Sequence, residues 1–286
     1  MSFKARTFLV SAVLSAVIYF LMFLMFSTEG HFLAGLFPEG GLRYLACLIF
    51  GIVASLITCA CVFLFSKNVK EQNAIMEEVE KNGYSDRFVE MLRTEVGRLS
   101  GKELTQLSFN YIIMLADAYL MKGRPEEAMR VINIVNPRKD PIFSPSKPMG
   151  INNQIKFYSL QIGICEPLRM VDRANAIMNE AMPVLTKNMG KLQSNDMIIY
   201  ETMCVYYLLI GRNDEAMRYA DACFRYNSRS AKFLGNVQKV RVYSYIQDLN
   251  AAYQHYSIAE GLVEKPVERD IMNYLQNYYL RTPAYN

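Results

Sequence analysis

Few residues of this sequence have a type and spacing that could perform chemistry. The chain contains only two histidines, His31 and His255, and no tryptophan. It has no glycine-rich phosphate loop, no HExxH metal motif, no GxSxG nucleophile and no paired catalytic carboxylates. A histidine can activate a neighbouring thiol, but nothing in the spacing of His255 and the cysteines favours such a couple. We therefore predict that the protein is not an enzyme.

The six cysteines do not indicate a metal centre. No two of them have the CxxC spacing, and the thiols of Cys59 and Cys61, two residues apart, would diverge on a helix. In a reducing compartment we expect all six to be free and mostly buried. We predict neither a metal site nor a cofactor.

Composition and charge narrow the class of protein. Of the 286 residues, 52% are hydrophobic, which is too many for a disordered chain. The net charge of +4 is spread over 31 Lys+Arg and 27 Asp+Glu, so nucleic acid is not an expected partner. Residues 1–66 hold only three cations and two anions. Residues 1–66 and the more highly charged remainder of the chain therefore belong in different solvents.

Residues 1–66 are predicted to form a transmembrane helical hairpin. Uncharged runs cover residues 7–28 and 44–66, and about 20 helical residues cross a hydrocarbon layer of about 30 Å. We place the two spans at about 7–27 and 44–66. The first run lacks the short core and small-residue cleavage site of a signal peptide. The lipid bilayer is therefore a predicted partner.

Charges that flank the spans predict their orientation. Lys4 and Arg6 precede the first span, Lys67 and Lys70 follow the second, and Arg43 is the one cation between them. The positive-inside rule places the N-terminus and the C-terminal domain in the cytoplasm of an integral membrane protein, and a bacterial inner membrane suits so short a hairpin. Small residues recur every four positions along both spans. They could pack the hairpin itself or dock another membrane protein.

Residues after 66 show helical periodicity throughout. Juxtamembrane helices are predicted over 67–82 and 85–99, within a segment that we bound at 67–103. The spacing of Ser100 and Glu103 predicts a capping box that opens a helix ending at Gly123. Four prolines between Pro137 and Gly150 predict an irregular segment. That segment is either a surface insertion or a flap beside a binding groove.

An internal repeat predicts how these helices are arranged. Residues 123–130 (GRPEEAMR) recur as residues 211–218 (GRNDEAMR), and Tyr119 and Tyr207 each lie four residues before the glycine. Each copy lies between two amphipathic helices. Because one helix-turn-helix unit cannot bury its apolar face alone, such units must stack.

The repeats resemble the tetratricopeptide repeat (TPR) family. One unit matches the family pattern at Leu115, Ala116, Tyr119, Gly123 and Ala128, and another at Tyr200, Cys204, Tyr207, Gly211, Ala216 and Cys223. Two weaker units match at Tyr158, Ile162, Ala174, Met178 and Ala181, and at Val240, Tyr243, Ala252, Tyr256 and Ala259. The turn-side alanines, Ala128, Ala174, Ala216 and Ala252, are 46, 42 and 36 residues apart.

The fold class implied is all-α, with the transmembrane hairpin followed by a TPR-like α-solenoid over residues 104–286. A C-terminal helix, 267–281, would cap the array. A divergent helical solenoid of another type is the alternative architecture.

TPR arrays bind peptides or partner proteins in a concave groove lined by the first helix of each pair. The resemblance implies these groove candidates: Asn110, Ile113, Asp117, Leu120, Ile198, Glu201, Val205, Leu208 and Arg241. The Lys and Asn donors with which co-chaperone members clamp a C-terminal carboxylate are absent. Tyr278, Tyr279 and Tyr285 are further candidates for contacts with partners, because tyrosine is favoured in interfaces.

We therefore expect a membrane-anchored, TPR-like adaptor that binds a protein or peptide client at the cytoplasmic face of the membrane. The alternative is an accessory subunit of a larger membrane protein complex, in which the spans bind another membrane protein.

Overall fold

The computed structural model describes residues 69–99 and 103–281, together with residues 16–18, 21, 49, 52–53 and 56–57, which are helical. The two predicted spans, 7–27 and 44–66, otherwise lie outside the described residues. Among the residues that are described, no helix is both long and apolar enough to cross a membrane. The chain divides into two compact units, 1–76 and 77–286.

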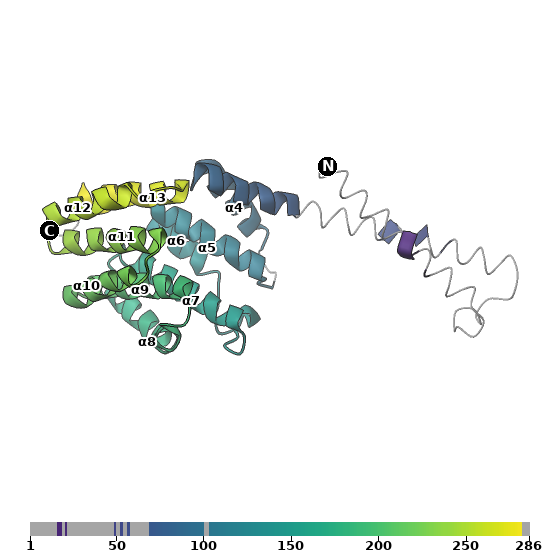
Figure 1. Ribbon diagram of the computed structural model, residues 1–286. Coiled ribbons are helices and arrows are strands. Elements are labelled where there is room, and N and C mark those ends of the chain that lie inside the picture. The colour runs from purple at the N-terminus through teal and green to yellow at the C-terminus, as the bar shows by residue number, and fades with distance from the viewer. Residues whose placement is uncertain are drawn as a thin grey trace, which may run out of the picture. The chain divides into compact units, whose positions relative to one another are not determined.

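The described part of the chain is helical and contains no strand, which confirms the all-α prediction (Figure 1). Residues 69–82 form a helix that ends at Gly83. The elements that follow are α4 (Asp86–Gly97), α5 (Gln106–Met121), α6 (Pro125–Ile132), η1 (Pro141–Phe143), α7 (Pro148–Cys165), α8 (Val171–Asn188), α9 (Gln193–Leu209), α10 (Asn213–Ala222), η2 (Cys223–Arg225), α11 (Arg229–Tyr245), α12 (Leu249–Glu260), α13 (Pro266–Leu275) and a π-helical turn, η3 (Gln276–Leu280).

Four successive helix pairs make up most of the second unit. α5 packs on α6, α7 on α8, α9 on α10 and α11 on α12, and the first helices of neighbouring pairs also contact one another. This arrangement fits an α-solenoid. α4 packs on α5, so the compact unit includes the segment that we bounded as juxtamembrane from Glu77 onward.

The turns within the four pairs share one backbone geometry. Gly123 and Gly211 have φ values of 70° and 77°, and Arg169 and Gln247 adopt the same left-handed region at 55° and 63°. The amide after each of these residues donates to the carbonyl five residues before it, at 2.8 to 3.0 Å. This bond closes the C-terminus of each first helix. The two weak units therefore have the same turn as the clear ones, although they lack its glycine.

The turn-side alanines let the two helices of each pair approach closely. Each lies five residues after the left-handed residue of its turn, and all four are fully buried. The helix pairs thus occur at the intervals of 46, 42 and 36 residues that the alanines predict. A larger side chain at these positions would push the helices apart, at a cost typical of overpacking.

Two predicted boundaries were wrong. α5 begins at Gln106 rather than after Ser100, because Thr105 is its N-cap and accepts a hydrogen bond of 3.2 Å from the amide of Ser108. The segment from Pro137 to Gly150 is also not free of helix. Pro148 occupies the first turn of α7, where proline lacks no hydrogen bond that the helix needs.

The irregular segment between α6 and α7 is held down by Phe143. Its ring is 2% exposed and packs edge-on against Phe109 and Phe157, with centroid distances of 5.1 and 5.7 Å. Asn153 of α7 donates to the carbonyl oxygen of Ile142 at 2.9 Å. The segment is therefore anchored to the core at its centre.

Candidate partner-binding face

The nine groove candidates come from three of the four first helices. Five of them are half-buried and present part of their side chains to solvent: Asn110, Ile113, Asp117, Ile198 and Glu201. The other four, Leu120, Val205, Leu208 and Arg241, are buried. Leu208 packs in a core cluster with Ala216, Ala220 and Val242, so it belongs to the core rather than to an open surface.

The structure brings Glu201 of α9 and Arg241 of α11 together. Nη1 of Arg241 lies 3.1 Å from Oε1 of Glu201 and 3.2 Å from the side-chain oxygen of Gln238. Nε2 of Gln238 donates to the same Glu201 oxygen at 3.2 Å. Nε of Arg241 has no partner among the described residues. A buried guanidinium thus fixes the half-exposed carboxylate of Glu201.

Asp117 of α5 is fixed from another direction. The phenolic hydroxyl of Tyr84, in the turn before α4, donates to Oδ2 of Asp117. Burial raises the pKa of Asp117 to about 6; the hydrogen bond from Tyr84 opposes the rise, Glu201 adds to it and Arg241 opposes it. Asp117 therefore titrates closer to neutral pH than an exposed aspartate does.

The inner positions of α7 were missed by the sequence prediction. The 46-residue interval between Ala128 and Ala174 carries the four α5 candidates onto Lys156, Ser159, Gly163 and Glu166. All four of these are small or charged, and a Cβ atom at Gly163 would lie 3.6 Å from Leu120, at van der Waals contact. The repeat spacing alone identifies these positions, whereas the residues by which the second unit matches the family pattern are packing positions.

Glu166 belongs to a buried cluster with two tyrosines. It is 2% exposed, and its two carboxylate oxygens accept hydrogen bonds from Tyr245 at 2.5 Å and Tyr279 at 2.9 Å. Burial raises the pKa of Glu166, and Tyr245, Arg241 and Tyr279 oppose the rise. The Arg241 guanidinium lies 5.9 Å from the centroid of the Tyr279 ring. Tyr279 is therefore an internal residue rather than the exposed partner anchor that we predicted.

The C-terminal segment α13–η3 closes the array instead of only capping it. It contacts α11 and α12, as a cap would, but it also contacts α5 (Figure 1). The amide of Tyr84 donates to Oδ2 of Asp270 at 2.7 Å, and Met121 of α5 packs on the core cluster that contains Leu275 and Tyr279. Part of the predicted groove is thus occupied by the chain's own last helix.

The remaining candidates for chemistry have structural surroundings. The three cysteines in the described part are buried free thiols, and burial raises the pKa of Cys165 to about 11 and of Cys223 to about 12. His255 lies 2.8 Å from Asn236 and stacks on Tyr243. Among the described residues, no group of three or more His, Cys, Asp or Glu side chains could hold a metal ion.

Comparisons of the chain with protein-family models, curated proteins and solved structures give no match.

Proposed function

We propose that the protein is a membrane-anchored, TPR-like adaptor that binds a protein or peptide client through the inner face of its helical repeats. The repeated turn geometry and the buried turn-side alanines support the likeness to TPR arrays. The two uncharged runs in residues 1–66 and their flanking lysines and arginines support the anchor and the cytoplasmic orientation.

One observation supports the proposed client-binding site most directly. Asp117 and Glu201 come from α5 and α9, and each is mostly buried with part of its side chain open to solvent, while a side chain from another helix or turn holds it in place. Fixed carboxylates beside half-exposed apolar residues, Ile113 and Ile198, form a binding surface that needs little ordering before a client binds. Such a surface favours a client with apolar and hydrogen-bond-donating or cationic side chains.

Burial of several candidates limits the extent of this surface. Leu120, Val205 and Leu208 are buried, so the client face consists of the five half-exposed candidates on α5 and α9. The membrane anchor would raise the effective concentration of the client beside other membrane proteins, as tethering does for linked binding modules.

The test is site-specific photo-crosslinking of the full chain in cells. A photoreactive residue replaces Ile198 on the inner face, Ile258 on the outer face of α12, or Ile52 in the second predicted span. Ile258 is 51% exposed and serves as the matched control. The adaptor predicts a protein adduct at position 198 that is absent at position 258.

The photoreactive residue at position 52 distinguishes the adaptor from the alternative function, an accessory subunit. A membrane-protein adduct at position 52 with none at position 198 would favour the accessory subunit of a membrane complex. Recovery of the full chain from membranes by alkaline carbonate alone would contradict the anchor.

A further inference from the structure

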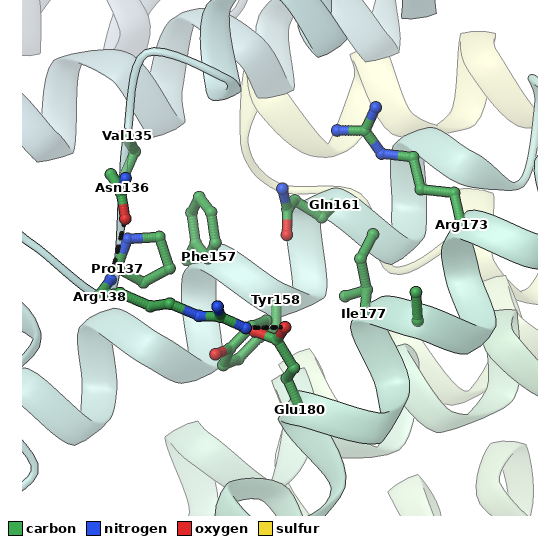
Figure 2. A pocket seen from close by; sticks show the side chains of 11 residues that line it. Val135, Asn136, Pro137, Arg138, Phe157, Tyr158, Gln161, Arg173, Ile177 and Glu180 are labelled. Atoms are coloured by element: carbon green, nitrogen blue, oxygen red, sulfur yellow. Dashed lines mark hydrogen bonds and ion pairs between the residues drawn. The ribbon is translucent and has the colours of Figure 1, made fainter.

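A second concave site lies away from the inner face, between α7, α8 and the segment that follows α6. It is a pocket of about 310 Å³. Its walls are apolar and aromatic, formed by Val135, Pro137, Phe157, Tyr158 and Ile177 (Figure 2). This volume is at the lower end of the range for ligand pockets, and the lining has the usual character of one.

Gln161 of α7 is the unusual member of this pocket. Gln161 is 9% exposed, yet its side-chain amide forms no hydrogen bond with any group in residues 69–99 and 103–281. Figure 2 shows the amide in the open space between Phe157 and Ile177. The side chain is largely buried, but its amide is not one of the fully buried polar groups without a partner, so solvent in the pocket reaches it and a ligand can take the place of that solvent. Its donor and acceptor match the N–H and C=O of a peptide group.

Two arginines at the pocket differ in how they are paired. Arg138 forms an ion pair of 2.6 Å with Glu180, so its charge is already compensated. Arg173 donates to the side-chain oxygen of Asn133 at 2.7 Å, and no carboxylate of the described residues pairs with it. A guanidinium offers five donors, so Arg173 can still bind a carboxylate.

We propose that this pocket binds a peptide segment that places an apolar, preferably aromatic, side chain between Phe157 and Ile177 and a carboxylate at Arg173. The Gln161 amide pairs with the backbone of that segment. The volume holds one large side chain, and the exposed rim leaves the rest of a peptide outside. The charge of Arg173 selects an acidic neighbour. The site is separate from the inner face and does not depend on the adaptor function.

The experiment uses disulfide capture, which detects weak binding. Ala176 is exposed on the pocket wall, and Ala176→Cys in the full chain, in lipid nanodiscs, provides the thiol. The probe is the peptide acetyl-Cys-Gly-Phe-Glu-amide as its mixed disulfide with 2-mercaptoethanol, at a fixed excess of free 2-mercaptoethanol. The thiolate at position 176 attacks the peptide sulfur and releases 2-mercaptoethanol as the new disulfide forms. Mass spectrometry measures the fraction of chain that is linked. Ser257→Cys, on an exposed position of α12, is the matched control, and the unsubstituted chain reports the native cysteines.

We expect Ala176→Cys to be linked about tenfold more than Ser257→Cys, the ratio that one good charged contact provides. Replacing Phe by Ser or Glu by Gln in the probe should remove most of the difference. Adding Gln161→Leu should lower capture severalfold without lowering the melting temperature, because its amide has no protein partner. Adding Arg173→Gln should weaken capture of the Glu probe but not of the Gln probe.

Two results would overturn the proposal. One is equal capture at positions 176 and 257 by all three probes. The other is a Gln161→Leu chain that melts several degrees lower, since the amide would then have a structural role that the pocket does not require.

Discussion

The hydroxyl of Tyr279 donates a hydrogen bond of 2.9 Å to Oε2 of Glu166, which lies 113 residues earlier in the chain. Tyr245 donates to the other oxygen of the same carboxylate at 2.5 Å. The three residues come from η3, the end of α7 and the end of α11. Because the carboxylate is buried, loss of either donor leaves a polar oxygen without a partner.

Tyr279→Phe should therefore destabilise the full chain by about 1 to 2 kcal/mol, the usual cost of an unsatisfied buried group. Urea unfolding in detergent micelles measures the change. Tyr253→Phe is the matched control, because Tyr253 is 50% exposed. When Glu166→Gln is combined with Tyr279→Phe, we expect the two costs to be strongly non-additive. Additive costs would show that the two side chains do not interact.

Alanine substitution at two glycines should distinguish two costs in stability: the backbone strain of a turn, and the steric clash where α13 closes the array. Gly83 and Gly211 both have positive φ values, of 62° and 77°. A Cβ atom at Gly211 would meet nothing within 4 Å, whereas one at Gly83 would lie 2.3 Å from Asp270 and 3.1 Å from the backbone of Pro266. We expect Gly211→Ala to cost about 1 to 2 kcal/mol and Gly83→Ala about 2 to 4 kcal/mol. Equal losses in unfolding free energy would contradict the close approach of α13.

The raised pKa of Asp117 predicts that Asp117→Asn increases the stability of the folded chain, by an amount that depends on pH. The carboxyl titrates near pH 6 in the folded chain and near 3.9 when unfolded, so folding disfavours its charged form. This penalty is complete above about pH 6 and absent below about pH 4. The asparagine variant, which can still accept from Tyr84, should be about 1 to 2 kcal/mol more stable than the parent at pH 8 and no more stable at pH 4.

The control for this titration is Asp86→Asn. Lys122 donates a hydrogen bond of 2.8 Å to Asp86, and this contact lowers the pKa of Asp86. The sign is then opposite: any loss of stability appears above the unfolded pKa and disappears in acid. If both variants moved in the same direction with pH, a general change in net charge would explain the result better than the environment of Asp117.

The ion pair that anchors α13 should lose stability when its geometry is changed. Arg229 donates to both oxygens of Glu268, at 3.0 and 2.7 Å, and the amides of Glu264 and Lys265 donate to Glu268 as well. Arg229→Lys keeps the charge but loses the paired contact, so we expect a cost of about 1 to 2 kcal/mol at pH 7. Arg138→Lys, at an exposed pair, should change stability by less than about 0.5 kcal/mol.

Acid should reduce the Arg229→Lys difference. Burial alone would raise the pKa of Glu268, but Arg229 and the two backbone amides lower it overall. Its contribution is therefore present above the unfolded pKa of about 4.3 and is lost as the pH falls through the folded value. Melting temperatures at pH 7 and pH 3.5 measure the change. A difference that stayed constant would place the effect outside this carboxylate.

The repeats could be predicted from the sequence because each one is defined by nearby residues. A tyrosine, a left-handed turn residue and an alanine lie within ten positions of one another, as at Tyr119, Gly123 and Ala128. The weak second unit was found through Ala174 although Cys165 takes the place of the tyrosine and Arg169 that of the glycine. Turn geometry and small-residue packing are local properties, and their spacing is visible in one dimension.

The contacts of the C-terminal helix could not be predicted in the same way. The amphipathic pattern of α13 shows that it packs on something, but not that Asp270 would accept from Tyr84, 186 residues away. For the same reason the groove candidates were assigned as if the face were open. Arg241, for example, lies against the ring of Tyr279 in η3, whose position depends on the curvature of the whole array.

The closure also changes how the array can come apart. In an open solenoid each repeat contacts only its neighbours, so the ends fray first and stability is a sum of neighbouring terms. Here the last helix contacts the first pair, and α13 cannot detach without exposing Met121 and the amide of Tyr84. The repeats therefore form a ring of contacts rather than a line. Such a ring has no weak end at which unravelling can begin, so its helices should be lost together in one cooperative step.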